Sequence, residues 1–123
     1  MGFSLEEKVW SCFEAAQAKK AQELLALDLK NLSSVTDCFI ICHGTSGRQV
    51  RAIADVISET LAEKGIAPLS IEGYKEGRWI LMDYGEMVVH IFTEEVRRFY
   101  DLEHLWGQAP PLPLDEERTS HHG

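Results

Sequence analysis

The residues best suited to chemistry lie around a short apolar run near position 40. Cys38, Cys42 and His43 are all residue types that bind metals, and a histidine can also act as a general base. On a β-strand, neighbouring side chains point to opposite faces, so Cys42 and His43 do not face one ion together. The spacing also matches no CxxC-type zinc pattern. We therefore expect no metal site here.

The turn Gly44-Thr45-Ser46-Gly47 follows this run and precedes an expected helix, where backbone N–H groups could bind an anion. It matches neither GxxxxGK[ST] nor GxGxxG. A strand, a Gly-Thr-Ser turn and a helix resemble the opening of nucleotidyltransferase folds, which need paired carboxylates to hold divalent metals. The next expected strand, residues 68–72, carries no such pair, and Asp83 and Glu86 flank a turn instead.

Nucleophilic catalysis has no better support. No serine lies in a GxSxG motif, and no cysteine has a histidine placed by a recognisable signature. An enzyme of the nucleotidyltransferase kind is therefore the weaker alternative. We expect no catalytic residue and no cofactor.

Size and charge narrow the class of partner. The 123 residues suffice for one domain with a core and are too few for two. The 20 acidic residues outnumber the 12 lysines and arginines, and the net charge is −8. Because nucleic-acid affinity comes largely from basic side chains, we expect little direct contact with RNA or DNA. An acidic chain suits a basic partner instead, including a basic nucleic-acid-binding protein.

The compartment follows from the cysteines and the N-terminus. An odd number of cysteines, three, is typical of reduced thiols, so we expect a cytoplasmic protein. The first residues reach charge before any apolar run, which argues against a signal peptide. No window approaches 18 apolar residues, so we expect no membrane span.

Capping residues and periodicity predict the first elements. Residues 4–7, Ser-Leu-Glu-Glu, form a capping box that opens a helix ending near position 20. Leucines at alternate positions predict a half-exposed strand over residues 22–30. The continuous apolar run 38–42 predicts a strand buried on both faces. Residues 46–49, Ser-Gly-Arg-Gln, form a second capping box, and the helix it opens stops at Gly65.

The second half of the chain completes an α/β domain. Residues 68–72 form a short strand and residues 78–92 a hairpin, and Thr93 caps a third helix that ends at Gly107. We predict a mixed five-stranded sheet with three main helices, in one domain over residues 1–108. Residues 109–123 are Pro-rich and then polar, and we expect a disordered tail there.

The hairpin, RWILMDYGEMVVHIF, is the most apolar stretch of the chain. With Tyr84 and Gly85 at its tip, Leu81 pairs with Val88 and Trp79 pairs with His90. Tyrosine at the first turn position carries an unfavourable positive φ, so a longer loop is the alternative. In either case both faces are apolar. One is a core face, and the other consists of Trp79, Leu81, Val88, His90 and Phe92, with Asp83, Glu86 and Tyr84 at its rim.

Two arrangements of this second face stay open. The third helix, with Phe99 and Tyr100, packs over it and makes Trp79 a core residue, or part of the face stays exposed. We favour exposure, because three helices must cover both faces of five strands and the third is short. An exposed tryptophan among aliphatic residues with an acidic rim is typical of a protein-binding surface. The same surface could support self-association.

Three blocks of the chain resemble the ribosomal silencing factor family, also called the Iojap-like family. They are TDCFIICHGTSGRQVRAIADVI (36–57), GRWILMDYGEMVVHIF (77–92) and RFYDLEHLWG (98–107). The resemblance implies a nucleotidyltransferase-like fold without the catalytic carboxylates. It also implies a protein that binds the large ribosomal subunit through ribosomal protein L-fourteen, blocks joining of the small subunit and represses translation under nutrient limitation.

The resemblance also assigns residues. It implies partner-binding roles for Trp79, Leu81, Asp83 and Tyr84, to which the hairpin register adds Val88 and His90. Homodimers are a further implication. Relatives in organelles act in large-subunit assembly, so an assembly factor is the alternative function within the family.

Overall fold

The first two helices begin at the residues that cap them. The computed structural model of the protein describes residues 2–112. The Ser4 hydroxyl accepts a hydrogen bond from the N–H of Glu7, and the Glu7 carboxylate accepts one from the N–H of Ser4, which confirms the first capping box. The second box is half formed. Ser46 accepts from the N–H of Gln49, but the Gln49 side chain accepts from Thr45 instead of Ser46.

The elements form an α/β fold, as predicted. The helices are α1 (Leu5–Ala18), α2 (Gly47–Ala62), α3 (Glu94–Tyr100) and α4 (Leu102–Leu105). The strands are β1 (Gln22–Asp28), β2 (Cys38–Gly44), β3 (Ser70–Glu72), β4 (Trp79–Asp83) and β5 (Met87–Thr93). They make one sheet in the order β1-β2-β5-β4-β3, in which β2 and β5 are parallel and the other pairs are antiparallel. The mixed five-stranded sheet is thus confirmed.

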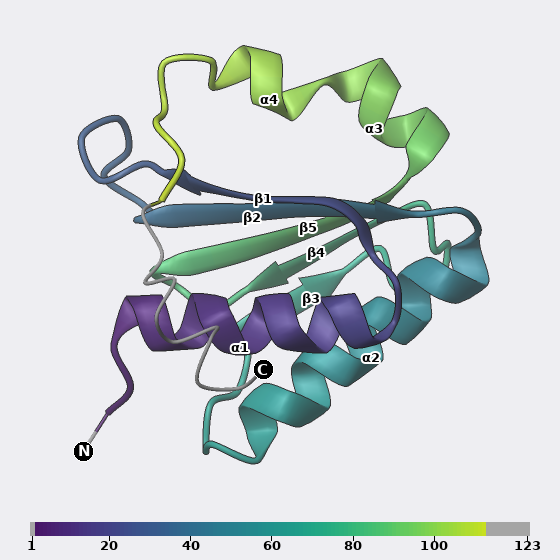
Figure 1. Cartoon of the computed structure of the whole chain (residues 1–123), viewed down its shortest axis with the longest axis horizontal. Helices are drawn as coiled ribbons and strands as arrows, with labels where there is room; N and C mark the ends of the chain where they lie inside the picture. The colour runs from purple at the N-terminus through teal and green to yellow at the C-terminus, as the bar shows by residue number, and fades with distance from the viewer. Residues whose placement is uncertain (1, 113–123) are drawn as a thin grey trace.

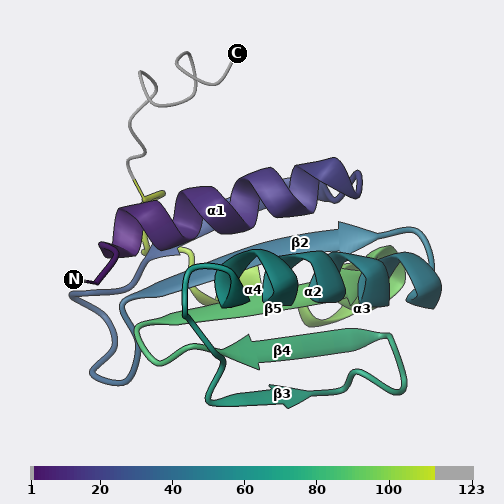
Figure 2. The same cartoon turned by 90° about the horizontal axis from the view of Figure 1, so that it is seen from below.

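Helices lie on both faces of the sheet. Helices α1 and α2 pack on one face, and α3 and α4 lie over the other (Figure 1). Figure 2 shows α3 and α4 behind β2 and β5, while no helix of the described chain lies behind β3 and β4. The second face is therefore covered at its β1 and β2 side and left open at its β3 and β4 side.

The apolar core has two parts, one on each face of the sheet. The larger part joins α1 and α2 to the sheet and includes Ile80, Met82, Met87, Val89 and Ile91 of the hairpin. The smaller part lies under α3 and α4 and includes Ile41, Phe92 and Val96. Because β5 contributes to both, it is buried along nearly its whole length. Both faces of the hairpin are apolar, as the sequence indicated.

Strand β1 is more buried than its alternating pattern predicts. Ala26 and Leu27 point to opposite faces and are each 5% exposed, whereas Gln22 and Glu23 are exposed, so the expected half-exposed strand is confirmed only in part. The outer edge of β1 is also covered. The N–H of Asp28 donates to the carbonyl of Pro110 (2.8 Å), and the N–H of Leu112 donates to the carbonyl of Ala26 (2.9 Å).

The sequence predicts a tail from residue 109 onward, but the structure places residues 109–112 against the sheet. Ala109 is 9% exposed and belongs to the smaller part of the core. Leu112 packs against the larger part. Residues 113–123, the rest of the expected tail, lie outside the described residues.

The third helix is two helices. Asp101 adopts the left-handed conformation (φ 50°, ψ 56°) between α3 and α4 and breaks the helix predicted from Thr93 to Gly107. Aspartate tolerates this region better than most residues do. The break turns α4 along the sheet and places Trp106 against Phe39 of β2, with ring centroids 5.7 Å apart.

No helix among the described residues is long and apolar enough to cross a bilayer.

Candidate functional site

The tip of the hairpin lies one residue further along the chain than the sequence suggested, and this shifts the pairing of the two strands by two residues. Gly85 and Glu86 form its tip, because the N–H of Tyr84 donates to the carbonyl of Met87 (2.8 Å). Leu81 therefore pairs with His90, and Trp79 pairs with Phe92, so the predicted register is wrong. Glycine is well suited to the first tip position, where Gly85 has a φ of 89°. A register shift of two leaves the strand residues 79–83 and 87–92 on their predicted faces.

The open part of the second face forms a depression that we call the sheet groove. It has a volume of about 570 Å³ and runs over β2, β5, β4 and β3. It is lined by Ser33, Val35, Thr36, Phe39, Leu69, Glu72, Leu81, Asp83, Gly85, Val88, His90 and Trp106. Four of the expected partner-binding residues are among them. Two aliphatic side chains at its margins, Val35 and Leu69, are 85% and 75% exposed.

Trp79 lies beside the sheet groove and is half-buried. Its ring packs between Phe92 (centroids 4.9 Å apart) and Tyr100 of α3 (4.8 Å), while Phe99 points away and is 79% exposed. The third helix thus covers Trp79 in part, and Tyr100 is the aromatic ring of that helix that packs on it. The structure falls between the two arrangements that the sequence left open, since Trp79 is neither a core residue nor a free anchor.

Tyr84 lies on the other face of the sheet from the groove. It packs against the α1 side of the core, and its hydroxyl is buried with no hydrogen-bond partner among the described residues. Burial raises the pKa of this hydroxyl to about 12. The expected group of six residues is therefore not brought together, because odd and even positions of a strand point to opposite faces.

His90 and Val88 form part of the floor of the sheet groove. They are only 4% and 9% exposed, so neither is a projecting contact residue. Burial lowers the pKa of His90 to about 4, which keeps the ring neutral. The indole N–H of Trp79 donates to Nδ1 of His90 (3.1 Å). Because Nδ1 accepts, the ring proton is on Nε2, and Nε2 has no partner among the described residues.

The acidic rim differs from the one that the sequence predicts. Glu86 forms an ion pair with Lys8 of α1 on the other side of the sheet, so it does not border the groove. Asp83 does, and its Oδ1 accepts a hydrogen bond from the N–H of Gly85 (2.8 Å). The second acid of the groove is Glu72 of β3, which sequence reasoning missed. Its only signal was the polar end of a three-residue strand.

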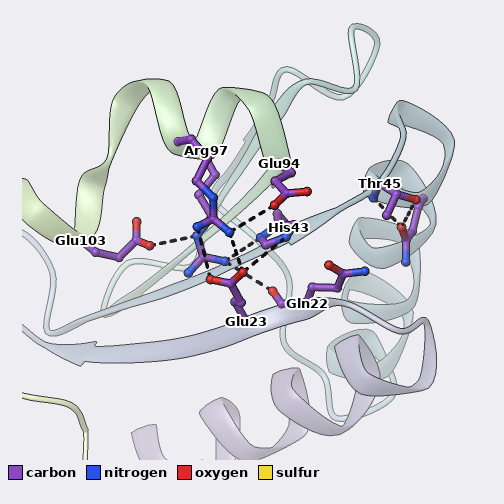
Figure 3. A network of polar contacts seen from close by, with 9 residues as sticks. Gln22, Glu23, His43, Thr45, Glu94, Arg97 and Glu103 are labelled. Carbon is purple, nitrogen blue, oxygen red and sulfur yellow. Dashed lines mark hydrogen bonds and ion pairs between the residues drawn. The ribbon is translucent and has the colours of Figure 1, made fainter.

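A second polar cluster, which we call the ion-pair network, lies where α3 and α4 pack on β1 and β2 (Figure 3). It consists of Glu23, His43, Glu94, Arg97, Arg98 and Glu103. Arg97 is 3% exposed and donates to Glu103 (3.0 Å) and to Nδ1 of His43 (2.9 Å). Arg98 is half-exposed and pairs with Glu23 (2.6 Å) and Glu94 (3.2 Å).

This network contains the one group of described residues with metal-ligand spacing. Ligand atoms of Glu23, His43 and Glu94 lie within 4.8 Å of one another. Arg97 already donates to Nδ1 of His43, however, so Nε2 carries the ring proton and offers no lone pair to a metal. Arg98 occupies both carboxylates. The geometry is that of a paired network that fastens α3 to the sheet.

The other candidates for chemistry, the three cysteines and the Gly-Thr-Ser turn, are buried or already hydrogen-bonded within the protein. Burial raises the pKa of Cys38 and of Cys42 to about 12 and raises that of Cys12 as well, so all three thiols stay protonated and unreactive. In the Gly-Thr-Ser turn, the N–H of Thr45 donates to Oε1 of Gln49 (2.6 Å). This N–H is therefore not available to a bound anion.

Comparison with known proteins gives a consistent result. Residues 3–123 match the family model described as "Ribosomal silencing factor during starvation". The chain is 48% identical over 101 residues to the ribosomal silencing factor RsfS of Bacillus subtilis, covering 82% of this chain and 86% of that protein. It is 42% identical over 112 residues to the protein of the same name from Halalkalibacterium halodurans, covering 91% of this chain and 96% of the relative.

A crystal structure of a protein from Chromobacterium violaceum has the same fold, with a TM-score of 0.83 at 35% identity. The match covers 85% of this chain and 88% of that one. A more distant match, 30% identical over 91 residues, carries the name "Mitochondrial assembly of ribosomal large subunit protein 1" in Mus musculus. This chain covers 40% of the length of that mouse protein.

Proposed function

The chain belongs to the ribosomal silencing factor family, and from this premise we propose that it binds the large ribosomal subunit through ribosomal protein L-fourteen. Bound there, it blocks joining of the small subunit and represses translation when nutrients are limiting. It acts in the cytoplasm and by steric obstruction, without catalysis. The family and the names of the relatives support the ribosomal partner.

The observation that carries this proposal is the sheet groove, an apolar surface that α3 and α4 leave uncovered. A sheet face of this kind normally packs against another element, and a large apolar patch on a folded domain is typical of a binding site. Leu81 is half-buried in the middle of the groove, and Leu69 projects at its margin. Closing a protein over these side chains removes apolar area from water and stabilises the complex.

The charge of the chain favours a protein partner over ribosomal RNA. The net charge is −8, and both ionised side chains of the groove, Glu72 and Asp83, are acidic. Phosphate groups would be repelled there, whereas a basic ribosomal protein would be attracted. We expect the contact to be made to protein with little direct contact to nucleic acid.

Leu69→Ala tests the proposal, because Leu69 is 75% exposed and its loss leaves the fold intact. We expect this variant to pellet less with purified large subunits, and to restore subunit joining measured by light scattering. Leu105→Ala is the matched control, since Leu105 is 73% exposed on α4 outside the sheet groove. Equal binding by the two variants would contradict the proposal.

A second function, large-subunit assembly, is favoured by the name of the mouse relative. Both functions begin with binding to the large subunit, so binding alone does not separate them. Sucrose-gradient profiles of a deletion strain do. Immature large-subunit particles during growth indicate assembly, whereas normal particles with excess subunit joining in starvation indicate silencing.

Self-association and enzymatic activity make separate predictions. We propose that the protein also forms homodimers, which light scattering coupled to size-exclusion chromatography measures directly. A nucleotidyl-transferring enzyme would bind a nucleotide with a divalent metal. Titration with ATP and magnesium should give no heat of binding, and saturable heat would revive that alternative.

A further inference from the structure

Two acidic side chains of the sheet groove face outward from the same side of neighbouring strands. Ser70 of β3 pairs with Asp83 of β4, and Glu72 pairs with Leu81. Glu72 and Asp83 are therefore diagonal neighbours on one face, a spacing that charged side chains can bridge. Neither forms an ion pair within the described chain, and Glu72 has no hydrogen-bond partner there either.

Neighbouring like charges on a sheet repel, and here no ion pair within the described chain offsets the repulsion. A cation from outside would offset it and would meet up to three free carboxylate oxygens, since only Oδ1 of Asp83 is hydrogen-bonded. Salt bridges from a lysine or an arginine fit this geometry, and arginine can bind two such oxygens at once.

The floor of the same groove adds no charge that would compete for this cation. Burial keeps the His90 ring neutral, and its Nε2 is buried without an acceptor among the described residues. A basic side chain of an extended protein segment would therefore meet Glu72 and Asp83 as the charged groups of the groove.

The apolar part of the groove suits the same occupant. Leu81 lies beside Glu72 across the β3–β4 pair, and Val88 pairs with Asp83 across the β4–β5 pair. Lysine and arginine carry long aliphatic stems that pack on apolar surface while the charged end reaches a carboxylate. A nucleic-acid strand has neither an apolar stem nor a positive end, and its phosphates would meet two carboxylates.

We propose that the sheet groove is a binding site for a lysine or arginine side chain of a protein partner. The stem lies on Leu81 and Val88, and the cation pairs with Glu72 and Asp83. This inference rests on the proposed function, because it names the anchor by which the ribosomal protein is held.

The test compares two double variants that remove the same charge. Glu72→Gln with Asp83→Asn keeps the size of both side chains and the acceptor for the N–H of Gly85. Glu59→Gln with Glu63→Gln removes two exposed acids at the end of α2, on the other face of the sheet. Each protein is titrated against purified ribosomal protein L-fourteen and against purified large subunits, at low and at high salt.

We expect the groove variant to bind both probes about tenfold more weakly or worse, and to lose most of the salt dependence seen with the unmodified protein. The control variant should stay within about twofold. Thermal unfolding should be unchanged in both.

Four results would overturn the inference. Unchanged affinity of the groove variant would contradict the proposed cation site but would leave the proposed function in place. Equal weakening of both variants would show a general effect of net charge, and tighter binding of the groove variant would show a nucleic-acid contact. If the unmodified protein binds neither probe, the proposed function fails and the anchor fails with it.

Discussion

The sheet groove and the ion-pair network lie on the same face of the sheet, and each is built around a buried histidine. In both, Nδ1 accepts a hydrogen bond, from Trp79 at His90 and from Arg97 at His43. They differ in what surrounds the ring. The carboxylates of the network are paired with arginines of α3, whereas those of the groove have no ion-pair partner in the described chain.

This difference separates charges that hold the fold from charges that are available to a partner. A buried ion pair is strongly destabilising to break, because one charge is left in an apolar setting. An unpaired surface acid contributes little to stability and can be removed at low cost. Mutations in the ion-pair network should therefore lower stability, whereas mutations of the groove acids should lower binding and leave stability nearly unchanged.

Arg97→Met should have the largest effect on stability. Arg97 is 3% exposed, and its loss leaves Glu103 and His43 without their donor. We expect the free energy of unfolding to fall by about 3–5 kcal/mol, measured by urea titration with tryptophan fluorescence. Arg98→Met, which removes the exposed arginine next to it, should change the unfolding midpoint little. Equal losses of stability in the two variants would show that burial of an ion pair does not determine how much it contributes to stability.

Acid should weaken the fold through the groove histidine. The unfolded chain binds a proton at the ordinary histidine pKa, 6.5, whereas folded His90 binds one only at about 4. This contribution to stability is fully present above pH 6.5 and is lost as the pH falls toward 4, by roughly 3 kcal/mol in total.

Burial and Arg97 also lower the pKa of His43, so it acts in the same direction. Proton NMR titration resolves the two rings. The ring signals of His90 should not move between pH 7 and pH 5, and a midpoint near 6.5 would contradict the buried neutral ring.

Trp79→Phe tests whether the indole fixes the proton of His90. The variant keeps an aromatic ring between Phe92 and Tyr100 but loses the hydrogen bond to Nδ1. We expect a loss of about 1–2 kcal/mol in the free energy of unfolding. Nitrogen NMR of the imidazole should show the Nε2–H form in the parent and a mixture in the variant. A single unchanged form would mean that another contact fixes the ring.

Glu72→Gln should have the smallest effect on the fold. The side chain of Glu72 is exposed and has no ion-pair partner in the described chain, so the melting temperature Tm should change by less than about 2 °C. Calorimetry provides the measurement. A clear fall in Tm would show that Glu72 has a structural role, and the contrast between the two regions would be lost.

Most of the fold could be predicted because its signals are local. Ser4 and Glu7 form their capping box within one helical turn, and the continuous apolar run of β2 fits a strand buried on both faces. Alternation along the hairpin also assigned the residues of its two strands, though not Tyr84 and Glu86 near the turn, to their correct faces. That assignment depends only on whether a position is odd or even, so it survived an error in the turn.

The turn itself was misplaced because a glycine fits two positions in a tight hairpin. The sequence placed Gly85 second, after Tyr84, and the structure places it first, before Glu86. The unfavourable positive φ of Tyr84 was the available signal against the first placement, but the longer loop that we gave as the alternative is not what the structure shows.

The composition of the groove could not be predicted because it depends on contacts between distant segments. Glu86 was assigned to the binding face, but Lys8 of α1 holds it on the other side. Glu72 and Phe39 reach the groove only through the pairing of β3 with β4 and of β2 with β5. No short stretch of sequence contains that information.

The pairing of residues 110–112 with β1 has a consequence for synthesis of the chain. Strand β1 is made early, but the groups that cover its outer edge follow only when translation reaches residue 112. Its inner neighbour β2 likewise waits for β5. An unpaired strand edge is a template for association with other chains. The emerging protein is therefore exposed to aggregation until late in its own translation, and slowing the ribosome within residues 93–112 should lower the soluble yield more than slowing it earlier.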